Sequence, residues 1–258
     1  MTTILSIPLK DGIILCADNL EQSTFLDGSG IDILIPFEKT SAKLFESKMH
    51  IYGFAGTTDI IEAMHNLYNT TGKNLDSFEK EFQKNIQSQI QLTTQLTEEK
   101  APKLKKNAKD SLETEVFFQG IFVDRATLEV TLLSSKHPKV KKMKLNDLFK
   151  SSFDGIGSGI QLFDLGNIVE VSNIISNVMG KLSTVETSKF TSEHLKNLVG
   201  LLDLYSRFDR FTGSPAVYGC EIKVISKGNV DSYKVKSRGI SYNKNNTVGG
   251  DVNANWWA

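Results

Sequence analysis

The first eighteen residues, 1–18, read MTTILSIPLKDGIILCAD and indicate how the chain begins to fold. Residues 3–9 and 13–17 are short, apolar runs rich in β-formers, and Lys10-Asp11-Gly12 separates them. An Asp-Gly pair between two such runs is typical of a tight β-hairpin. Chain ends are usually frayed, so a terminus that enters a hairpin from its second residue suggests that the terminus itself has a role.

The bulk composition is that of a globular protein. The chain has 258 residues, 40% of them hydrophobic, and its 30 Lys and Arg balance its 30 Asp and Glu. This charge balance excludes a general attraction to nucleic acid or to anionic membranes. Nothing in the interior reads as a linker between two cores. We therefore expect a single domain over residues 1–240, with an insertion at about 72–115 and a C-terminal tail over 241–258.

Cysteine and histidine usage favours a protein without disulfides, metals or cofactors. The two cysteines, Cys16 and Cys220, each lie in an apolar run, where a thiol behaves as a small hydrophobe. The four histidines have no ligand spacing, at positions 50, 65, 137 and 194. No stretch approaches the roughly 20 apolar residues of a membrane span, and the N-terminus lacks the pattern of a signal peptide. These features predict a cytoplasmic location.

The alternation of strand-like and helix-like segments predicts the fold class. After the hairpin, β-rich runs occur at 31–35, 43–45, 50–55, 116–123, 128–133, 216–226 and 230–236. Apolar residues at helical spacing predict four helices. The first covers 57–68 and the second begins near 75. The third lies in the segment after Gly159 and ends at Gly180, and the fourth begins at an N-cap at Ser192. The lysine-rich runs 97–115 and 139–144 read as solvated surface. The order predicts an α+β fold in which two stacked sheets lie between helix layers, a four-layer αββα sandwich.

The residue behind the start methionine offers a nucleophile. Methionine before a small residue is normally removed, which would leave Thr2 with a free amine beside its own hydroxyl. An N-terminal amine is one of the groups that can activate a threonine Oγ. Its reference pKa of about 7.7–8.0 makes it a poor base at neutral pH unless a nearby cation lowers that value. Asp18, at the end of the hairpin, and Lys43, before a later strand, could supply a carboxylate-held lysine.

Several stretches together resemble the consecutive motifs of proteasome β-subunits and of their bacterial relative HslV, which are N-terminal-threonine Ntn hydrolases. The motifs span nearly the whole chain in the family's order, at residues 2–5, 11–18, 41–45, 53–56, 157–159 and 209–213. The αββα sandwich of that family agrees with the order of elements above. The resemblance is to a divergent member.

The resemblance implies a set of site residues. Thr2 would be the nucleophile, Asp18 and Lys43 its supporting ion pair, and the N–H of Gly56 the oxyanion donor. Three further residues would surround the Thr2 amine, namely Ser158, Asp209 and Thr212. Another three would line the substrate pocket, namely Phe45, Phe54 and Thr58. A Gly-Ser-Gly turn that caps a helix is the competing interpretation for Ser158.

Three departures from the family pattern stand out. Thr212 replaces the usual serine, and the run at 56–58 is less glycine-rich than in the family. The segment 72–115 is longer than in either group. We expect no propeptide before Thr2, as in HslV.

The expected function is a threonine-type endopeptidase of a proteasome-like, compartmentalised kind. The resemblance implies homo- or hetero-oligomeric rings acting on polypeptides, with any ATPase unfoldase on a separate chain, since no phosphate-binding loop of the Lys-Ser or Lys-Thr type occurs here. Three alternatives remain open: a non-catalytic ring subunit, an amidase or peptide ligase that uses the same nucleophile, and an unrelated α/β binding protein.

Overall fold

The computed structural model describes most of the chain in thirteen stretches, residues 3–20, 22–26, 32–36, 42–56, 58–82, 84, 119–134, 141–143, 154–157, 169–209, 212–236, 239–243 and 251–252. The predictions made above for Thr2 and Ser158, and for the parts of the chain within residues 85–118, lie outside these stretches.

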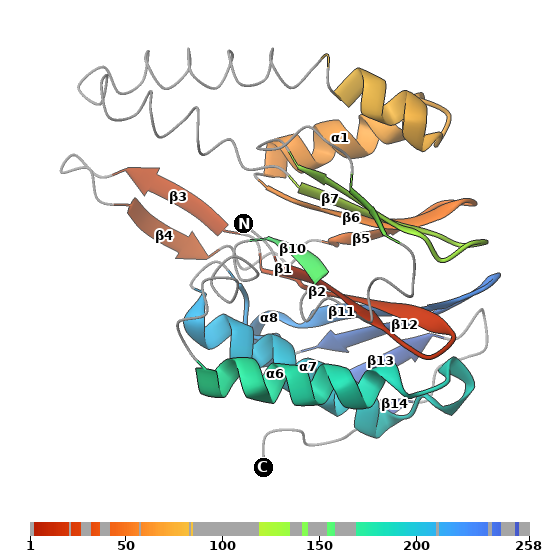
Figure 1. Cartoon of the computed structure of the whole chain (residues 1–258). Coiled ribbons are helices and arrows are strands. Elements are labelled where there is room, and N and C mark those ends of the chain that lie inside the picture. Colours follow the sequence, from red (N-terminus) through yellow and green to blue (C-terminus); the bar gives the residue numbers. More distant parts are fainter. Residues whose placement is uncertain are drawn as a thin grey trace.

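Two antiparallel sheets dominate the fold (Figure 1). The seven-stranded sheet has the order β10-β1-β2-β11-β12-β13-β14, and the five-stranded sheet has the order β5-β6-β7-β8-β9. The strands of the first are β1 Thr3–Pro8, β2 Gly12–Asp18, β10 Asp154–Gly157, β11 Cys220–Ser226, β12 Asn229–Lys236, β13 Gly239–Asn243 and β14 Asp251–Val252. Those of the second are β5 Leu44–Glu46, β6 His50–Ala55, β7 Gln119–Asp124, β8 Val130–Ser134 and β9 Lys141–Met143. A separate pair is formed by β3 Gln22–Leu26 and β4 Asp32–Pro36.

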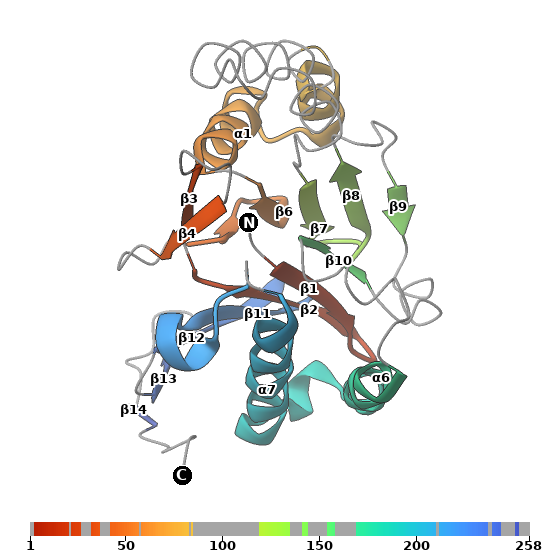
Figure 2. The same ribbon diagram turned by 90° about the vertical axis from the view of Figure 1, so that its left-hand side faces the viewer.

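The helices lie on the outer faces of the two sheets (Figures 1 and 2). Helix α1 Thr58–Thr70 and the helical residues 75–82 cover the five-stranded sheet. The seven-stranded sheet is covered by α6 Val169–Ser183 and α7 Ser192–Phe208. Two short helices complete the described elements, the 3₁₀ turn η2 Thr187–Lys189 and α8 Pro215–Tyr218. The structure therefore has an α+β fold, in agreement with the predicted class. No helix within the described stretches is both long and apolar enough to cross a membrane.

The predicted N-terminal hairpin is confirmed, and it lies in the middle of the seven-stranded sheet. β1 pairs with β2 on one side and with β10 on the other, and β2 also pairs with β11. Every residue of both strands is buried. Successive side chains of a strand point to opposite faces, so Ile4 joins the core between the two sheets while Leu5 joins the core under α6 and α7. Burial on both faces explains why the apolar runs of β1 and β2 show no alternation of apolar and polar residues.

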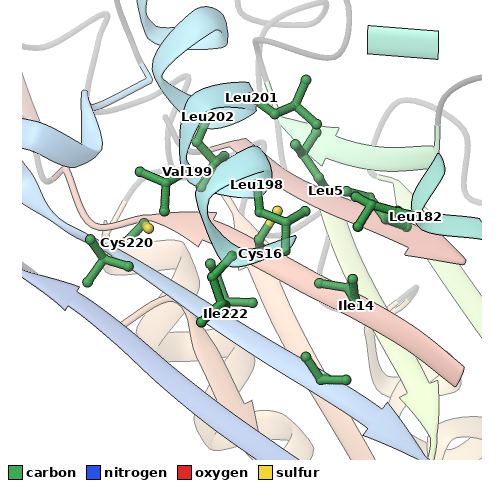
Figure 3. Packing of buried hydrophobic residues seen from close by; sticks show 14 of the residues in the cluster. Leu5, Ile14, Cys16, Leu182, Leu198, Val199, Leu201, Leu202, Cys220 and Ile222 are labelled. Carbon is green, nitrogen blue, oxygen red and sulfur yellow. The ribbon is translucent and has the colours of Figure 1, made fainter. Parts of the chain in front are cut away.

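The helix-side core, beneath α6 and α7, is aliphatic (Figure 3). Leu198 and Leu202 of α7 pack over Leu5, Ile14 and Ile222 of the sheet. The core also holds both cysteines as free thiols without exposed surface. Burial raises the pKa of the Cys16 thiol to about 12, so this thiol stays protonated and is a poor nucleophile. Packing therefore explains both cysteines.

The aromatic core lies between the five-stranded sheet and α1. Its members are Tyr52, Phe54, Ile61, Met64, Tyr68, Phe78, Phe82, Phe122 and Leu133. His50 lies at its edge, 4% exposed, with its Nδ1 2.7 Å from the Tyr68 hydroxyl and its Nε2 3.9 Å from Asp124 Oδ2. Burial lowers the pKa of the His50 ring, and the Asp124 carboxylate opposes this shift.

The buried His50 should make the fold sensitive to mild acid. Since its pKa is lowered on folding, the unfolded chain binds a proton first as the pH falls below about 6.5. Stability should therefore decrease from pH 7.5 toward 5.5, with at most about 1.4 kcal/mol per pH unit from this group. Urea unfolding at both pH values should show a smaller decrease for His50→Gln than for the wild type. Equal decreases in the two proteins would contradict this prediction.

Several predicted segments need correction. Residues 141–143, read as a solvated basic run, form β9, and residues 154–157 form β10. Main-chain pairing to β8 and β1 stabilises these two short strands despite their weak hydrophobic pattern. Residues 22–26, for which no strand was expected, form β3.

Helix boundaries differ in a similar way. Helix α6 continues past Gly180 to Ser183, and nothing lies within 4 Å of the place where a Gly180 Cβ would be. The N-cap of α7 is Thr191, one residue before Ser192, because its hydroxyl forms a capping box with His194. Residues 216–218, predicted as the start of a strand, belong to α8. Ser241, where the sequence suggested that a tail begins, lies inside β13.

Candidate active site

Asp18 is the last residue of β2 and has no exposed surface. Its Oδ1 accepts a hydrogen bond from the Thr3 N–H at 2.8 Å, and its Oδ2 accepts bonds from the N–H groups of Leu20 and Gly213, both at 3.1 Å. Burial raises the pKa of this carboxyl, while the charge of Lys43 and the three N–H donors act in the opposite direction. Three donors converging on two oxygens suit a carboxylate, which can only accept.

Lys43 lies just before β5 and is 5% exposed. Its Nζ donates a hydrogen bond to the carbonyl oxygen of Leu20 at 2.9 Å. Its backbone N–H donates to Oε2 of Glu221 at 3.2 Å, and the same oxygen accepts the N–H of Leu44 at 3.3 Å. Lys43 is thus held at its backbone and at its ammonium group, and its charge acts on the buried Asp18 carboxyl.

A line of buried hydrogen bonds joins the start of β1 to the end of α7. The Thr212 hydroxyl donates to Oδ2 of Asp209 at 2.6 Å, and the hydroxyl oxygens of Thr3 and Thr212 are 2.6 Å apart. Because the Thr212 hydrogen is used on Asp209, Thr3 is the donor to Thr212. The three side chains are at most 3% exposed. The orientation of each hydroxyl is therefore fixed by its neighbour.

Two glycines allow the elements to approach one another here. A Cβ on Gly213 would overlap the Cβ of Leu20 and lie 3.3 Å from Asp18 Oδ2. A Cβ on Gly53 in β6 would lie 2.7 Å from Ile4 Cδ1 and 2.8 Å from the Lys43 carbonyl oxygen. Glycine at these positions thus lets the loop before α8 pack against the end of β2, and lets β6 pack against β1 and Lys43.

The structure brings four of the predicted catalytic residues into one buried group with Thr3, namely Asp18, Lys43, Asp209 and Thr212. Thr2 and Ser158 lie outside the described residues. Their neighbours in sequence, Thr3 and Gly157, are opposite one another in the pairing of β1 with β10.

The other predicted site residues follow β6 in the chain. Gly56 lies between β6 and α1, at the strand-to-helix break that the sequence suggested. Thr58 is the first residue of α1, and its side chain lies outside the described part of the structure.

The two aromatic residues expected in the substrate pocket belong to the aromatic core. Phe54 has no exposed surface, and its ring centroid is 5.6 Å from those of both Tyr52 and Phe122. Phe45 is half-buried and stacks on Tyr52 at 5.5 Å. Strand alternation explains this placement, because Leu44 and Ala55 take the inter-sheet face and their neighbours point toward α1. Packing beneath the helix therefore accounts for both rings and leaves Phe54 no surface for a ligand.

Three residues of the site were not predicted from the sequence as site residues. Thr3 and Gly213 lie inside quoted motifs without an assigned role, and Glu221 lies in a run read only as a strand. A charged residue facing inward in an otherwise buried strand was the available signal for Glu221. Within the described stretches, no three or more His, Cys, Asp or Glu side chains gather in a way that could hold a metal ion.

The chain is similar to known proteins in structure but has no detected similarity to them in the sequence comparisons. No protein-family model and no curated protein sequence matches the chain. The fold is similar to the solved structure of an Anbu (Gly-1) mutant from Hyphomicrobium sp. strain MC1, with a TM-score of 0.55 and 10% identity over 92% of this chain and 88% of that one. It is also similar to Anbu, an ancestral beta-subunit, from Yersinia bercovieri, with a TM-score of 0.50 and 13% identity over 92% and 87%.

A weaker likeness is to HslV from Trypanosoma brucei, with a TM-score of 0.45 and 16% identity over 87% of this chain and 99% of that one. The similarity to the two Anbu structures shows a proteasome-like fold.

Proposed function

We propose that the protein is an N-terminal threonine hydrolase that cleaves peptide bonds through an acyl-enzyme. The observation that carries this proposal is the buried group of Asp18, Lys43, Asp209 and Thr212 around Thr3. Asp18 accepts the N–H of the peptide bond that joins Thr2 to Thr3. The chain therefore leads from the proposed nucleophile directly into the buried group that its chemistry would need.

In the proposed reaction, removal of the preceding residue frees the amine of Thr2. That amine takes the proton of the Thr2 hydroxyl as Oγ attacks the carbonyl carbon of the substrate peptide bond. The C–N bond then breaks, the protonated amine returns its proton to the leaving nitrogen, and an ester remains on Oγ. Water, deprotonated by the same amine, attacks the ester carbonyl, the C–Oγ bond breaks, and the amine returns the proton to Oγ, which releases the carboxylic acid product and restores the Thr2 hydroxyl.

The surrounding groups would tune this amine and stabilise the developing charge. The positive charge of Lys43, held beside Asp18, disfavours a second cation and so keeps the Thr2 amine neutral. The Gly56 N–H, at the start of the turn into α1, would donate to the oxyanion. We assign Ser158, Asp209 and Thr212 to orientation of the amine. The fixed hydrogen-bond direction from Thr212 to Asp209 supports that role, because it leaves the Thr212 oxygen with two lone pairs, of which Thr3 uses one.

The assembly is part of the proposal. The likeness to Anbu, described as an ancestral beta-subunit, supports the four-layer αββα arrangement of the Ntn hydrolases and an oligomer of such subunits. We propose a cytoplasmic homo- or hetero-oligomeric ring that acts on polypeptides, with any ATPase unfoldase on a separate chain. Native mass spectrometry would report the number of subunits.

Labelling with a peptidyl epoxyketone tests the proposal, since this reagent reacts with an N-terminal threonine that has both a free amine and a free hydroxyl. We expect intact mass to show a chain that begins at Thr2 and gains one reagent, and fragment mapping to place the reagent on Thr2. The Thr2→Ala chain should neither be labelled nor hydrolyse an unfolded polypeptide, although its circular dichroism should be unchanged.

The same experiment separates the alternatives. Products joined by new amide bonds when an acceptor amine is added would indicate a ligase, and cleavage of small amides alone would indicate an amidase. A wild-type chain that keeps Met1 and is not labelled would overturn the proposal and favour a non-catalytic ring subunit.

A further inference from the structure

Lys43 directly precedes a short edge strand. β5 has three residues and, among the described strands, pairs only with β6. The charge of its ammonium group nevertheless acts on the Asp18 carboxyl, which belongs to the other sheet. A lysine side chain loses considerable rotamer freedom when it is held in one place. A contact from outside the five-stranded sheet would therefore help to fix the backbone from which the side chain extends.

Glu221 is in the right place to do so. Its neighbours in β11, Cys220 and Ile222, point into the helix-side core (Figure 3), so Glu221 points toward the five-stranded sheet. Across the pairing of β11 with β2 it is opposite Ala17, which belongs to the inter-sheet core. Its side chain is 8% exposed. A carboxylate is seldom buried to this extent without partners.

The partners of Glu221 are the backbone groups at Lys43. One oxygen, Oε2, accepts the N–H of Lys43 at 3.2 Å and the N–H of Leu44 at 3.3 Å. The other oxygen, Oε1, lies 3.4 Å from Nζ of Lys234, whose side chain is 67% exposed. Hydrogen bonds to a charged acceptor are stronger than neutral ones. The buried oxygen therefore acts on the backbone of Lys43, and the charge on the other oxygen is partly balanced by Lys234.

We propose that Glu221 is a positioning residue for the reaction, which holds the Lys43 backbone so that the ammonium group stays where its charge acts on Asp18. Asp18 is opposite Cys220, the neighbour of Glu221 in β11, so the carboxylate that binds the Lys43 backbone and the carboxyl on which the Lys43 charge acts belong to one sheet. This role rests on the proposed function, because it concerns the same nucleophile. Glu221 does not touch the substrate and acts only through Lys43.

Two substitutions separate the reach of the side chain from its charge. Glu221→Asp keeps the charge but withdraws the carboxylate by about 1.5 Å, the length of one carbon–carbon bond. Glu221→Gln keeps the reach and one accepting oxygen, with its NH₂ group beside the solvated Lys234. Lys223→Met is the matched control. Lys223 lies two residues along β11 and bonds Glu46 of β5 at 2.5 Å, so its loss also removes a bridge between the two sheets and leaves Lys43 untouched.

The first measurement is hydrogen exchange of the peptide covering residues 42–46 in the full-length proteins. We expect faster exchange of the amides of Lys43 and Leu44 in Glu221→Asp, near wild-type exchange in Glu221→Gln, and no change at these amides in Lys223→Met. This readout needs no activity. Unchanged exchange in Glu221→Asp, or equal acceleration in Lys223→Met, would overturn the positioning role.

The second measurement is the rate of epoxyketone labelling of Thr2 as a function of pH. With Lys43 displaced, the pKa of the Thr2 amine should rise, and a rise of one unit reduces the neutral fraction below that pKa by about tenfold. We expect about this loss near pH 7 in Glu221→Asp, less than about threefold in Glu221→Gln, and wild-type rates in Lys223→Met. A profile that is lowered without any shift along the pH axis would contradict the role. A wild-type chain that is not labelled overturns the proposed function itself, and with it this inference, whatever the exchange shows.

Discussion

Replacing Asp18 with asparagine is expected to reduce labelling of Thr2 by about 100-fold or more and to destabilise the fold by about 3–5 kcal/mol. The amide oxygen can still accept the Thr3 N–H, but the NH₂ group then faces the N–H groups of Leu20 and Gly213, so donor meets donor. The buried ammonium of Lys43 also loses the opposite charge beside it. Urea unfolding followed by circular dichroism, together with labelling rates, measures both effects.

Asp11→Asn is the matched control for this substitution. Asp11 lies in the turn of the same hairpin and also accepts a backbone N–H, that of Thr187 at 2.7 Å, but it is exposed. Loss of this solvated interaction should cost about 1 kcal/mol and leave labelling unchanged. If Asp18→Asn behaved like Asp11→Asn, the buried carboxylate would have no special role in the site.

Among additions of a single methyl group at the site, Gly213→Ala is expected to reduce stability and labelling the most. The added Cβ would overlap the Cβ of Leu20 and press against Tyr218 and Asp18. The loop must then move, and the Gly213 N–H must withdraw from the Asp18 carboxylate. Overpacking of this kind costs about 1–3 kcal/mol, and a buried carboxylate that loses a donor adds to it. We expect a lower urea midpoint and loss of labelling.

The same substitution in α7 should have the opposite effect. Nothing lies within 4 Å of a Cβ on Gly200, which is an exposed helical residue. Alanine favours the helix over glycine by about 0.5–1 kcal/mol, so Gly200→Ala should raise the midpoint without changing labelling. A Gly213→Ala protein as stable and as reactive as Gly200→Ala would contradict the geometry described for the loop before α8.

The parts of the fold that the sequence predicted are those with strong local patterns. The hairpin followed from the Asp-Gly turn between two apolar runs, and β6 from the apolar run at 50–55. Helix α7 followed from apolar residues at helical spacing. In each case the local preference and the final burial agree, which is why a single sequence was sufficient.

The missed parts depend on partners far away in the sequence. β9 and β10 are short and polar, and only pairing with β8 and β1 makes them strands. Phe54 was assigned to a pocket because its motif suggested one, whereas its face of the strand is set by β6 as a whole. Glu221 is 178 residues from the Lys43 N–H that it accepts. No local pattern encodes such a contact, although an inward-facing charge is a reason to look for one.

The hydrogen bonds at Asp18 also determine at which point of translation the site can form. Asp18 and its donor Gly213 are 195 residues apart, and β1 and β2 are flanked in the sheet by β10 and β11, which are translated late. At ribosomal rates of about 5–20 residues per second, about 10–40 s pass between the synthesis of the two residues. The nascent hairpin is therefore on the ribosome long before Asp209, Thr212 and Gly213 reach it. Under the proposed function, the site would be inactive during most of translation, because Asp209, Thr212 and Gly213, which are made late, complete the surroundings of β1 and Asp18, which are made first.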